Sequence, residues 1–114
     1  MSATIVDMAA LPRIKDASGE LVEVLNRETC GAEYAHGVLR FVESGRQFDA
    51  ATEEPMHQLI YVLEGAGVIK IDAVEYDVEK GGGVYLAPLE TAKVGQKGAE
   101  PLKLFHLTVP QGKN

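Results

Sequence analysis

The residues best suited to chemistry lie in one short polar stretch and at two later positions. Glu54, His57 and Gln58 lie close together, and Lys93 and His106 follow towards the C-terminus. Carboxylate, imidazole and amide groups can coordinate a divalent cation. An ammonium group can instead bind an anion, or act as an acid, a base or a Schiff-base nucleophile when its pKa is lowered. These residue types therefore allow both metal-dependent and metal-free chemistry.

Strand alternation divides these candidates between two faces. Successive side chains of an extended strand point to opposite sides. An inward Gln58 therefore puts His57 on the outer face, unless a bulge beside Pro55 turns the chain. By the same rule His106 shares a face with Leu104. We expect His106 to look into the interior, either as a ligand or as a core histidine satisfied by one hydrogen-bond partner.

Lys93 has two open placements. If it faces the interior, its ammonium group would pair with Glu53 or Glu54, because burying a carboxylate without a partner costs several kcal/mol. If Ala92 takes the inward position instead, Lys93 faces solvent. The first placement would supply positive charge in the interior without a metal.

Other polar residues are expected to be mainly structural. His36 and Arg40 alternate with Leu39 and Phe41, which predicts a polar face. Arg40 and Arg46 could meet a carboxylate ligand, but a solvated surface is favoured for both. Cys30 has no activating motif and is expected to be structural as well.

The elements that would carry these residues are short strands. Beyond Gly19 the chain alternates, in runs rich in β-branched and aromatic residues that are separated by turn signals. Many short strands at this spacing predict a β-sandwich or barrel. Only the first dozen residues could form a turn of helix. The predicted strands are Leu21–Leu25, Val38–Val42, Leu59–Leu63, Gly67–Ile71, Val74–Val78, Val84–Leu86 and Leu102–Val109.

The turns between these runs carry their own signals. Gly65 and Gly81 lie in glycine-rich turns where the backbone is expected to need a positive φ or a close approach. Ile71–Val74 predicts a tight hairpin, although Ala73 stands where glycine would be easier.

The composition indicates one ordinary globular domain. The chain has 114 residues, 46% hydrophobic and 25% charged, which is enough to bury a core without disulfides. Eleven basic and seventeen acidic residues give a net charge of −6, which disfavours nucleic acid and anionic membranes as partners. The single cysteine excludes an internal disulfide and fits a reducing compartment. Without a signal-peptide pattern or a membrane-length apolar run, we expect a cytoplasmic protein.

Part of this pattern resembles the cupin superfamily, over the region from Gly45 to Pro110. The first cupin motif is a glycine, five residues, His-x-His, three or four residues, a glutamate or glutamine, six residues and a glycine. Gly45, Gln58 and Gly65 keep this spacing, and the sequence from Gln58 to Gly65 closely matches that of the family.

The two histidines of that motif are replaced, and two alignments stay open. A strict count from the preceding glycine puts Ala51 and Glu53 on the histidines. The proline that often follows the second histidine, here Pro55, puts Thr52 and Glu54 there instead. A glutamate replaces the second histidine in either alignment.

The second cupin motif is also altered. It has a glycine, five residues, Pro-x-Gly-x-x-His and a later asparagine. Gly82 and Pro88 fit, Glu90 replaces the turn glycine, and a strict count puts Lys93 on the histidine. Counting back from the last strand puts Ala92 there instead, so the histidine is lost in both alignments.

The resemblance implies an all-β fold, a cupin-type double-stranded β-helix or jelly-roll barrel of two antiparallel sheets. Within it, residues 1–19 are expected to form a segment that packs on the barrel, and residues 20–114 the barrel domain. Small cupins commonly pair through an outer sheet face, so we expect a homodimer.

For function, we expect a small-molecule protein whose cavity uses Glu54, His57, Gln58, Lys93 and His106 without a tightly bound metal. It would be a binding protein, or a metal-free lyase, isomerase or epimerase in which Lys93 or His106 moves a proton. An alternative is a metal-dependent dioxygenase or hydrolase-like cupin, with a divalent transition metal on Glu54, Gln58 and His106. A further alternative is a structural or regulatory barrel that is filled by side chains and has no catalytic activity.

Overall fold

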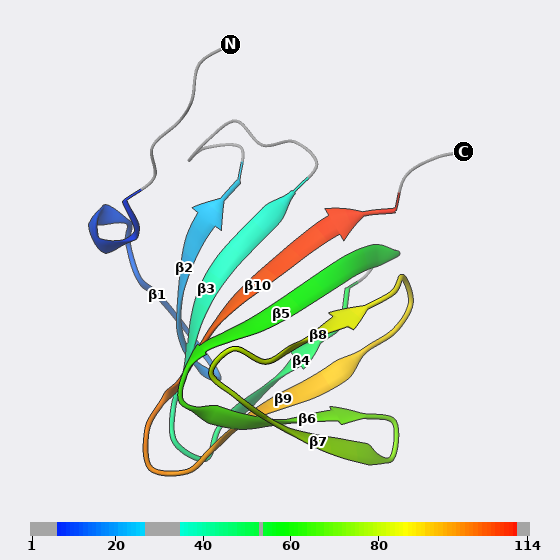
Figure 1. Ribbon diagram of the computed structural model, residues 1–114. Coiled ribbons are helices and arrows are strands. Elements are labelled where there is room, and N and C mark those ends of the chain that lie inside the picture. The colour runs from blue at the N-terminus through cyan, green and yellow to red at the C-terminus, as the bar shows by residue number, and fades with distance from the viewer. Residues whose placement is uncertain (1–6, 27–34, 53, 112–114) are drawn as a thin grey trace.

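The chain folds into two antiparallel β-sheets that face each other (Figure 1). The structure, a computed structural model, describes residues 7–26, 35–52 and 54–111. The six-stranded sheet has the order β1-β2-β3-β10-β5-β8, and the four-stranded sheet the order β4-β9-β6-β7. The strands of the larger sheet are β1 (Ile14–Asp16), β2 (Gly19–Leu25), β3 (His36–Val42), β10 (Leu102–Pro110), β5 (Met56–Glu64) and β8 (Gly83–Leu86). Those of the smaller sheet are β4 (Gln47–Ala50), β9 (Ala92–Lys97), β6 (Ala66–Ile71) and β7 (Val74–Glu79).

The predicted strands are all present, and the prediction of an all-β jelly roll is confirmed. β2, β3, β5, β6, β7, β8 and β10 contain the runs expected from alternation, whereas β1, β4 and β9 were not predicted. The turn of helix expected near the N-terminus is the 3-10 helix η1 (Met8–Ala10). Within the described ranges, no helix is long and apolar enough to cross a membrane.

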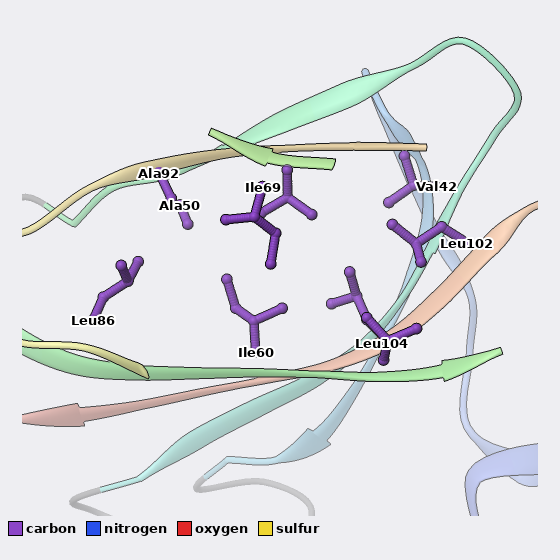
Figure 2. Packing of buried hydrophobic residues seen from close by; sticks show 10 residues of the cluster. Val42, Ala50, Ile60, Ile69, Leu86, Ala92, Leu102 and Leu104 are labelled. Carbon is purple, nitrogen blue, oxygen red and sulfur yellow. The ribbon is translucent and has the colours of Figure 1, made fainter. Parts of the chain in front are cut away.

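The core lies between the two sheets. Figure 2 shows aliphatic side chains of both sheets pointing toward one another across this space. Each fully buried aliphatic side chain stabilises the fold by about 1.5–3 kcal/mol relative to leaving it exposed. The buried members of this cluster are Val42, Ala50, Ile60, Val62, Ile69, Leu86, Ala92, Val94, Leu102 and Leu104.

The inner face of the larger sheet changes character along its strands. On β5, Ile60 is fully buried in the core, and Gln58 lies on the same face two residues earlier. On β10, Leu104 is in the core and His106 follows on the same face. Both polar side chains are buried, with exposed fractions of 1% for Gln58 and 6% for His106. One end of the interior is therefore apolar and the other is polar.

Two turns show how the sequence closes these strands. β6 and β7 are joined by the predicted tight hairpin, in which Ile71 pairs with Val74. Asp72 takes the positive φ of 55°, so Ala73 does not have to. Gly65 has a φ of 81°, and a Cβ there would lie 2.5 Å from the carbonyl oxygen of Pro101, so the turn before β6 requires glycine.

The outer face of the larger sheet is apolar as well. Val22, Val24 and Leu39 are buried there, and Leu11, from the segment before β1, packs against them. β1 pairs with β2 at the edge of the sheet. The division of the chain at residue 19 stays a prediction.

An exposed apolar row continues this outer face across β5 and β8. Leu59 is 43% exposed, Tyr61 44% and Tyr85 56%, and Leu59 pairs with Tyr85 across the two strands. A homodimer that pairs through this face would cover the row, because large exposed apolar groups often mark interfaces. The homodimer stays a prediction.

Candidate functional site

A pocket of about 600 Å³ occupies the polar end of the interior. One wall comes from the inner face of β3, β5 and β10, and the other from β4 and the segment that follows it. The residues that line it are His36, Val38, Arg40, Asp49, Ala51, Thr52, Glu54, Met56, Gln58, His106 and Thr108. Its size lies within the usual range for small-molecule sites, roughly 300–1,000 Å³.

Gln58 and His106 meet at the base of this pocket. The Nε2 atom of His106 lies 2.8 Å from Oε1 of Gln58, and Nε2 of Gln58 donates to the carbonyl oxygen of Ala50 at 3.2 Å. The amide is therefore bonded at both ends. It links β10 of one sheet to the end of β4 in the other.

Arg40 reaches the same imidazole from β3. Its Nε donates to Nδ1 of His106 at 3.3 Å, and its Nη1 donates to Oδ2 of Asp16 at 3.2 Å. The guanidinium carbon lies 4.4 Å from the centre of the Phe48 ring, which is a cation–π contact. The ring of Phe48 also lies 5.8 Å from that of His106.

These contacts fix the proton on His106. The Nε of Arg40 always carries hydrogen, so Nδ1 of His106 must be the acceptor. Nε2 then carries the ring proton and donates to Oε1 of Gln58. The result is one hydrogen-bond chain with a single direction, from Arg40 through His106 and Gln58 to the carbonyl of Ala50.

Burial and charge keep this histidine neutral. Burial is the largest cause that lowers the pKa of His106, to about 4, and the positive charges of Arg40 and His36 lower it further. Burial also lowers the pKa of Arg40, although its ion pair with Asp16 opposes this. Burial alone would raise the pKa of Asp16. Hydrogen bonds from Ser18 and Gly19, with the charge of Arg40, outweigh that effect and hold the pKa below its usual value.

Glu54 lines the pocket, but it is exposed. Thr52, the other residue of that alignment, also lines the pocket, and its hydroxyl donates to the carbonyl oxygen of Glu54 at 2.6 Å. Ala51, from the alternative alignment, lies in the same wall. Glu53, its partner there, lies outside the described residues, as does Cys30.

His57 does not line the pocket. It lies on the outer face of β5, as alternation with Gln58 predicts, and shares a hydrogen bond with the hydroxyl of Tyr85. The two rings are stacked, with centres 5.9 Å apart. A ligand in the interior pocket would not contact His57, so its predicted role in ligand binding finds no support in this arrangement.

The inward placement of Lys93 is wrong. Ala50 and Ala92 pair across β4 and β9 with both side chains buried, which puts their neighbours Asp49 and Lys93 on the exposed face. Lys93 lies in a neighbouring surface hollow that also includes Lys70 and shares Asp49 and Ala51 with the interior pocket. The alternative alignment, with Ala92 inward, is the one that the strand register supports.

The turn before β9 also differs from expectation. The amide of Glu90 donates to the carbonyl oxygen of Ala87, and the residue with a positive φ is Leu89, at 75°, rather than Glu90. The proline of the motif is therefore followed directly by the left-handed residue. This register agrees with the inward position of Ala92.

The expected place of Arg40 on a solvated surface is wrong. Its side chain is only 19% exposed, and it lies inside rather than on a solvated surface. The available signal was its neighbourhood, because Val38 and Val42 share its face of β3 and both are buried. A strand with apolar residues on both faces is covered on both faces.

Comparison with known proteins gives one sequence match. An uncharacterized protein of Methanocaldococcus jannaschii is 32% identical over 53 residues. The match covers 46% of this chain and 42% of that protein, so it spans less than half of either. No protein-family model matches the chain.

Solved structures match over nearly the whole chain. A predicted oxalate decarboxylase from Thermotoga maritima has a TM-score of 0.79 with 16% identity, and the match covers 95% of this chain and 100% of that one. KdgF from Halomonas sp. has a TM-score of 0.80 with 11% identity, covering 98% and 97%. A cupin protein from Bacteroides fragilis has a TM-score of 0.70 with 17% identity, covering 92% and 88%. At these identities the likeness is one of fold.

Proposed function

We propose that this chain, which has the cupin fold, binds a small polar molecule in its interior pocket and holds no transition metal there. The observation that carries the proposal is the hydrogen-bond chain of Arg40, His106 and Gln58 at the base of a pocket large enough for a small molecule. Val38 and Met56 supply apolar wall beside these polar groups. A barrel completely filled by side chains would leave no such space.

The donor set does not fit a transition metal. A metal needs a free lone pair on a ring nitrogen. In His106, Nδ1 accepts a hydrogen bond from Arg40 and Nε2 carries the proton. The guanidinium next to the ring would also repel a cation. Across the described ranges, no group of three histidine, cysteine, aspartate or glutamate residues could hold a metal ion.

The same contacts favour binding over proton transfer. Lys93 could not transfer a proton to a ligand in the pocket, because its side chain lies outside the pocket. Proton transfer by His106 would require Arg40 or Gln58 to give up its hydrogen bond to the ring when a ligand enters. Binding needs no such rearrangement, so it is the simpler reading of the site.

The proposal is tested by metal analysis and ligand screening of the same preparation. Protein purified without chelators is expected to contain no stoichiometric transition metal. In an NMR screen of single sugars, organic acids and amino acids, at least one compound is expected to shift the amide signals of Gln58, His106 and Thr108. Stoichiometric metal that disappears in His106→Ala would overturn the proposal, and so would a screen in which no compound moves these signals.

A pocket-filling variant and its control locate the binding. Thr108→Trp puts a large ring into the pocket and is expected to abolish the shifts. Thr91→Trp adds the same ring to the surface hollow that contains Lys93 and is expected to leave them unchanged. Equal behaviour of the two variants would place the binding elsewhere on the molecule.

A further inference from the structure

We infer that Arg40 is an oxyanion anchor, and that the pocket takes a small monocarboxylate with hydrogen-bond donors at its other end. This inference rests on the proposed function and names its ligand class. It depends on three features of the pocket: the unused donors of Arg40, the rigid placement of its guanidinium, and the opposite charge of the facing wall.

Arg40 has donors left for a ligand. A guanidinium group offers five N–H bonds on three nitrogens. Nε and Nη1 are bonded to His106 and Asp16, whereas Nη2 has no partner among the residues that the structure describes. No buried side-chain nitrogen or oxygen in those residues lacks a partner, so Nη2 must reach accessible space. Arg40 lines the interior pocket, and we take that space to be the pocket.

The guanidinium is held in place before any ligand arrives. The guanidinium packs over the Phe48 ring, and its Nε is held by the hydrogen bond to Nδ1 of His106. His106 is itself held by Gln58. A group that is already oriented loses little conformational freedom on binding, which favours affinity. A planar fork of donors is also the geometry that matches a carboxylate.

The contact with Asp16 shows that this guanidinium can pair with a carboxylate. Only its Oδ2 atom contacts Arg40. Its Oδ1 atom is held by the backbone of Ser18 and Gly19 and by the hydroxyl of Ser18. Asp16 therefore occupies one edge of the guanidinium from the side and competes with a ligand for it. The N–H groups of Nη2 remain for a ligand.

The facing wall carries the opposite charge. Glu54 lines it, two residues after the hydroxyl-bearing Thr52. A carboxylate there would repel a second carboxylate of a ligand but would accept hydrogen bonds from hydroxyl or ammonium groups. A ligand that spans the pocket thus fits best with one carboxylate at Arg40 and donor groups at the other end.

Acetate and its neutral isostere acetamide test the anchor. In NMR titrations of the full chain at neutral pH, with sodium chloride matched, acetate is expected to shift the Nε–H signal of Arg40 with a dissociation constant in the millimolar range. Acetamide is expected to leave it unchanged. Arg40→Gln should weaken the acetate response of the pocket amides by about tenfold or more, the usual scale for one charge-assisted contact.

Arg13→Gln is the matched control. Arg13 has the same kinds of contact as Arg40, an ion pair with Glu20 at 3.1 Å and a cation–π contact with Phe41 at 4.2 Å, but on the other face of the sheet. Its replacement is expected to leave acetate binding unchanged. Equal loss in the two variants, or equal shifts with acetate and acetamide, would overturn the inference while leaving the proposed function intact.

Asp16→Asn keeps the inference testable if Arg40→Gln does not fold. The amide oxygen of asparagine can still accept from Ser18 and Gly19, but the charged competitor at Arg40 is removed. Acetate is expected to bind about threefold to tenfold more tightly to this variant. Weaker binding would contradict the competition and the anchor with it.

Three related acids test the facing wall. 4-Hydroxybutyrate is expected to bind more tightly than butyrate, because only the former offers a donor to Glu54. Butyrate is expected to bind more tightly than succinate, because Glu54 would repel the second carboxylate of succinate. If succinate binds most tightly, the assignment of the ligand class is wrong. If no compound, including those of the wider screen, shifts the pocket signals, the result would instead count against the proposed function itself.

Discussion

Lowering the pH from 7 to 4 is expected to reduce the free energy of unfolding by about 3 kcal/mol through His106 alone. The pKa of this residue is about 4 in the folded protein and about 6.5 in the unfolded chain. Between these values the unfolded state binds the proton and the folded state does not. The stabilisation is therefore complete above pH 6.5. It is lost as the pH falls from 6.5 to 4, and the loss levels off below 4.

Urea unfolding of the native protein and His106→Gln between pH 4 and 7.5 measures this effect. All other charged groups are the same in both proteins, so the difference between the two curves isolates His106. The native curve is expected to fall more steeply towards acid than that of the variant. His57→Gln is the control, because His57 lies on the outer face beside Tyr85. Parallel curves for the native protein and His106→Gln would mean that His106 is not buried in its neutral form.

Gln58→Leu is expected to destabilise the protein by about 3 kcal/mol. Leucine has a similar volume, so the loss would come from hydrogen bonds rather than from a cavity. The ring N–H of His106 and the carbonyl of Ala50 would lose their partners in a buried site. Leaving a buried donor or acceptor unsatisfied costs about 1–3 kcal/mol for each group.

Gln96→Leu provides the comparison for Gln58→Leu. Gln96 accepts from the amide of Gly45 and donates to the carbonyl oxygens of Gly98 and Glu100, but at an exposed site where water can replace these bonds. Its replacement is expected to cost clearly less, as judged from urea unfolding at neutral pH. Equal losses of unfolding free energy in the two variants would show that the buried hydrogen bonds of Gln58 contribute no more to stability than exposed ones.

Gln58→Glu probes the same contact through charge. A carboxylate that accepts from Nε2 of His106 would stabilise the protonated ring, so the pKa of His106 should rise from its value near 4. The acid-side loss of stability would then shift to higher pH than in the native protein. An unchanged pH profile would indicate that residue 58 does not contact the ring.

Much of the fold could be predicted because most strands bury one face or both. The alternation in Leu59–Leu63 and Leu102–Val109 predicted β5 and β10 directly. β9 could not be predicted from its own residues, Ala-Lys-Val-Gly-Gln-Lys, which include a glycine and two lysines. It exists because β4 and β6 pair with it from both sides. Pairing with neighbouring strands can therefore outweigh a weak intrinsic strand propensity.

The site was predicted only in part. Gln58 was expected to face inward from its place in the cupin motif, and His106 because it shares its face with Leu104; the structure has both of them inside. Lys93 was uncertain because a shift of one residue in a strand exchanges the two faces. The pairing of Ala50 with Ala92 removes that uncertainty, and no single strand contains this information.

Arg40 shows a different limit of sequence reasoning. An arginine in a strand is usually exposed. Here its charge is tolerated inside because Asp16, Phe48 and His106 surround it, and these residues come from three other parts of the chain. Such compensation depends on tertiary contacts. The interior pocket thus has a neutral, hydrogen-bonded imidazole beside a guanidinium at its base.

The ring nitrogens of His106 are the most direct test of this arrangement. A proton–nitrogen correlation spectrum of the imidazole side chains, recorded at neutral pH on protein purified without chelators, reports the state of each nitrogen. The arrangement predicts a protonated Nε2 and an unprotonated Nδ1 that accepts a hydrogen bond from Arg40. A ring protonated at Nδ1, or a nitrogen signal that shows coordination to a metal, would contradict it.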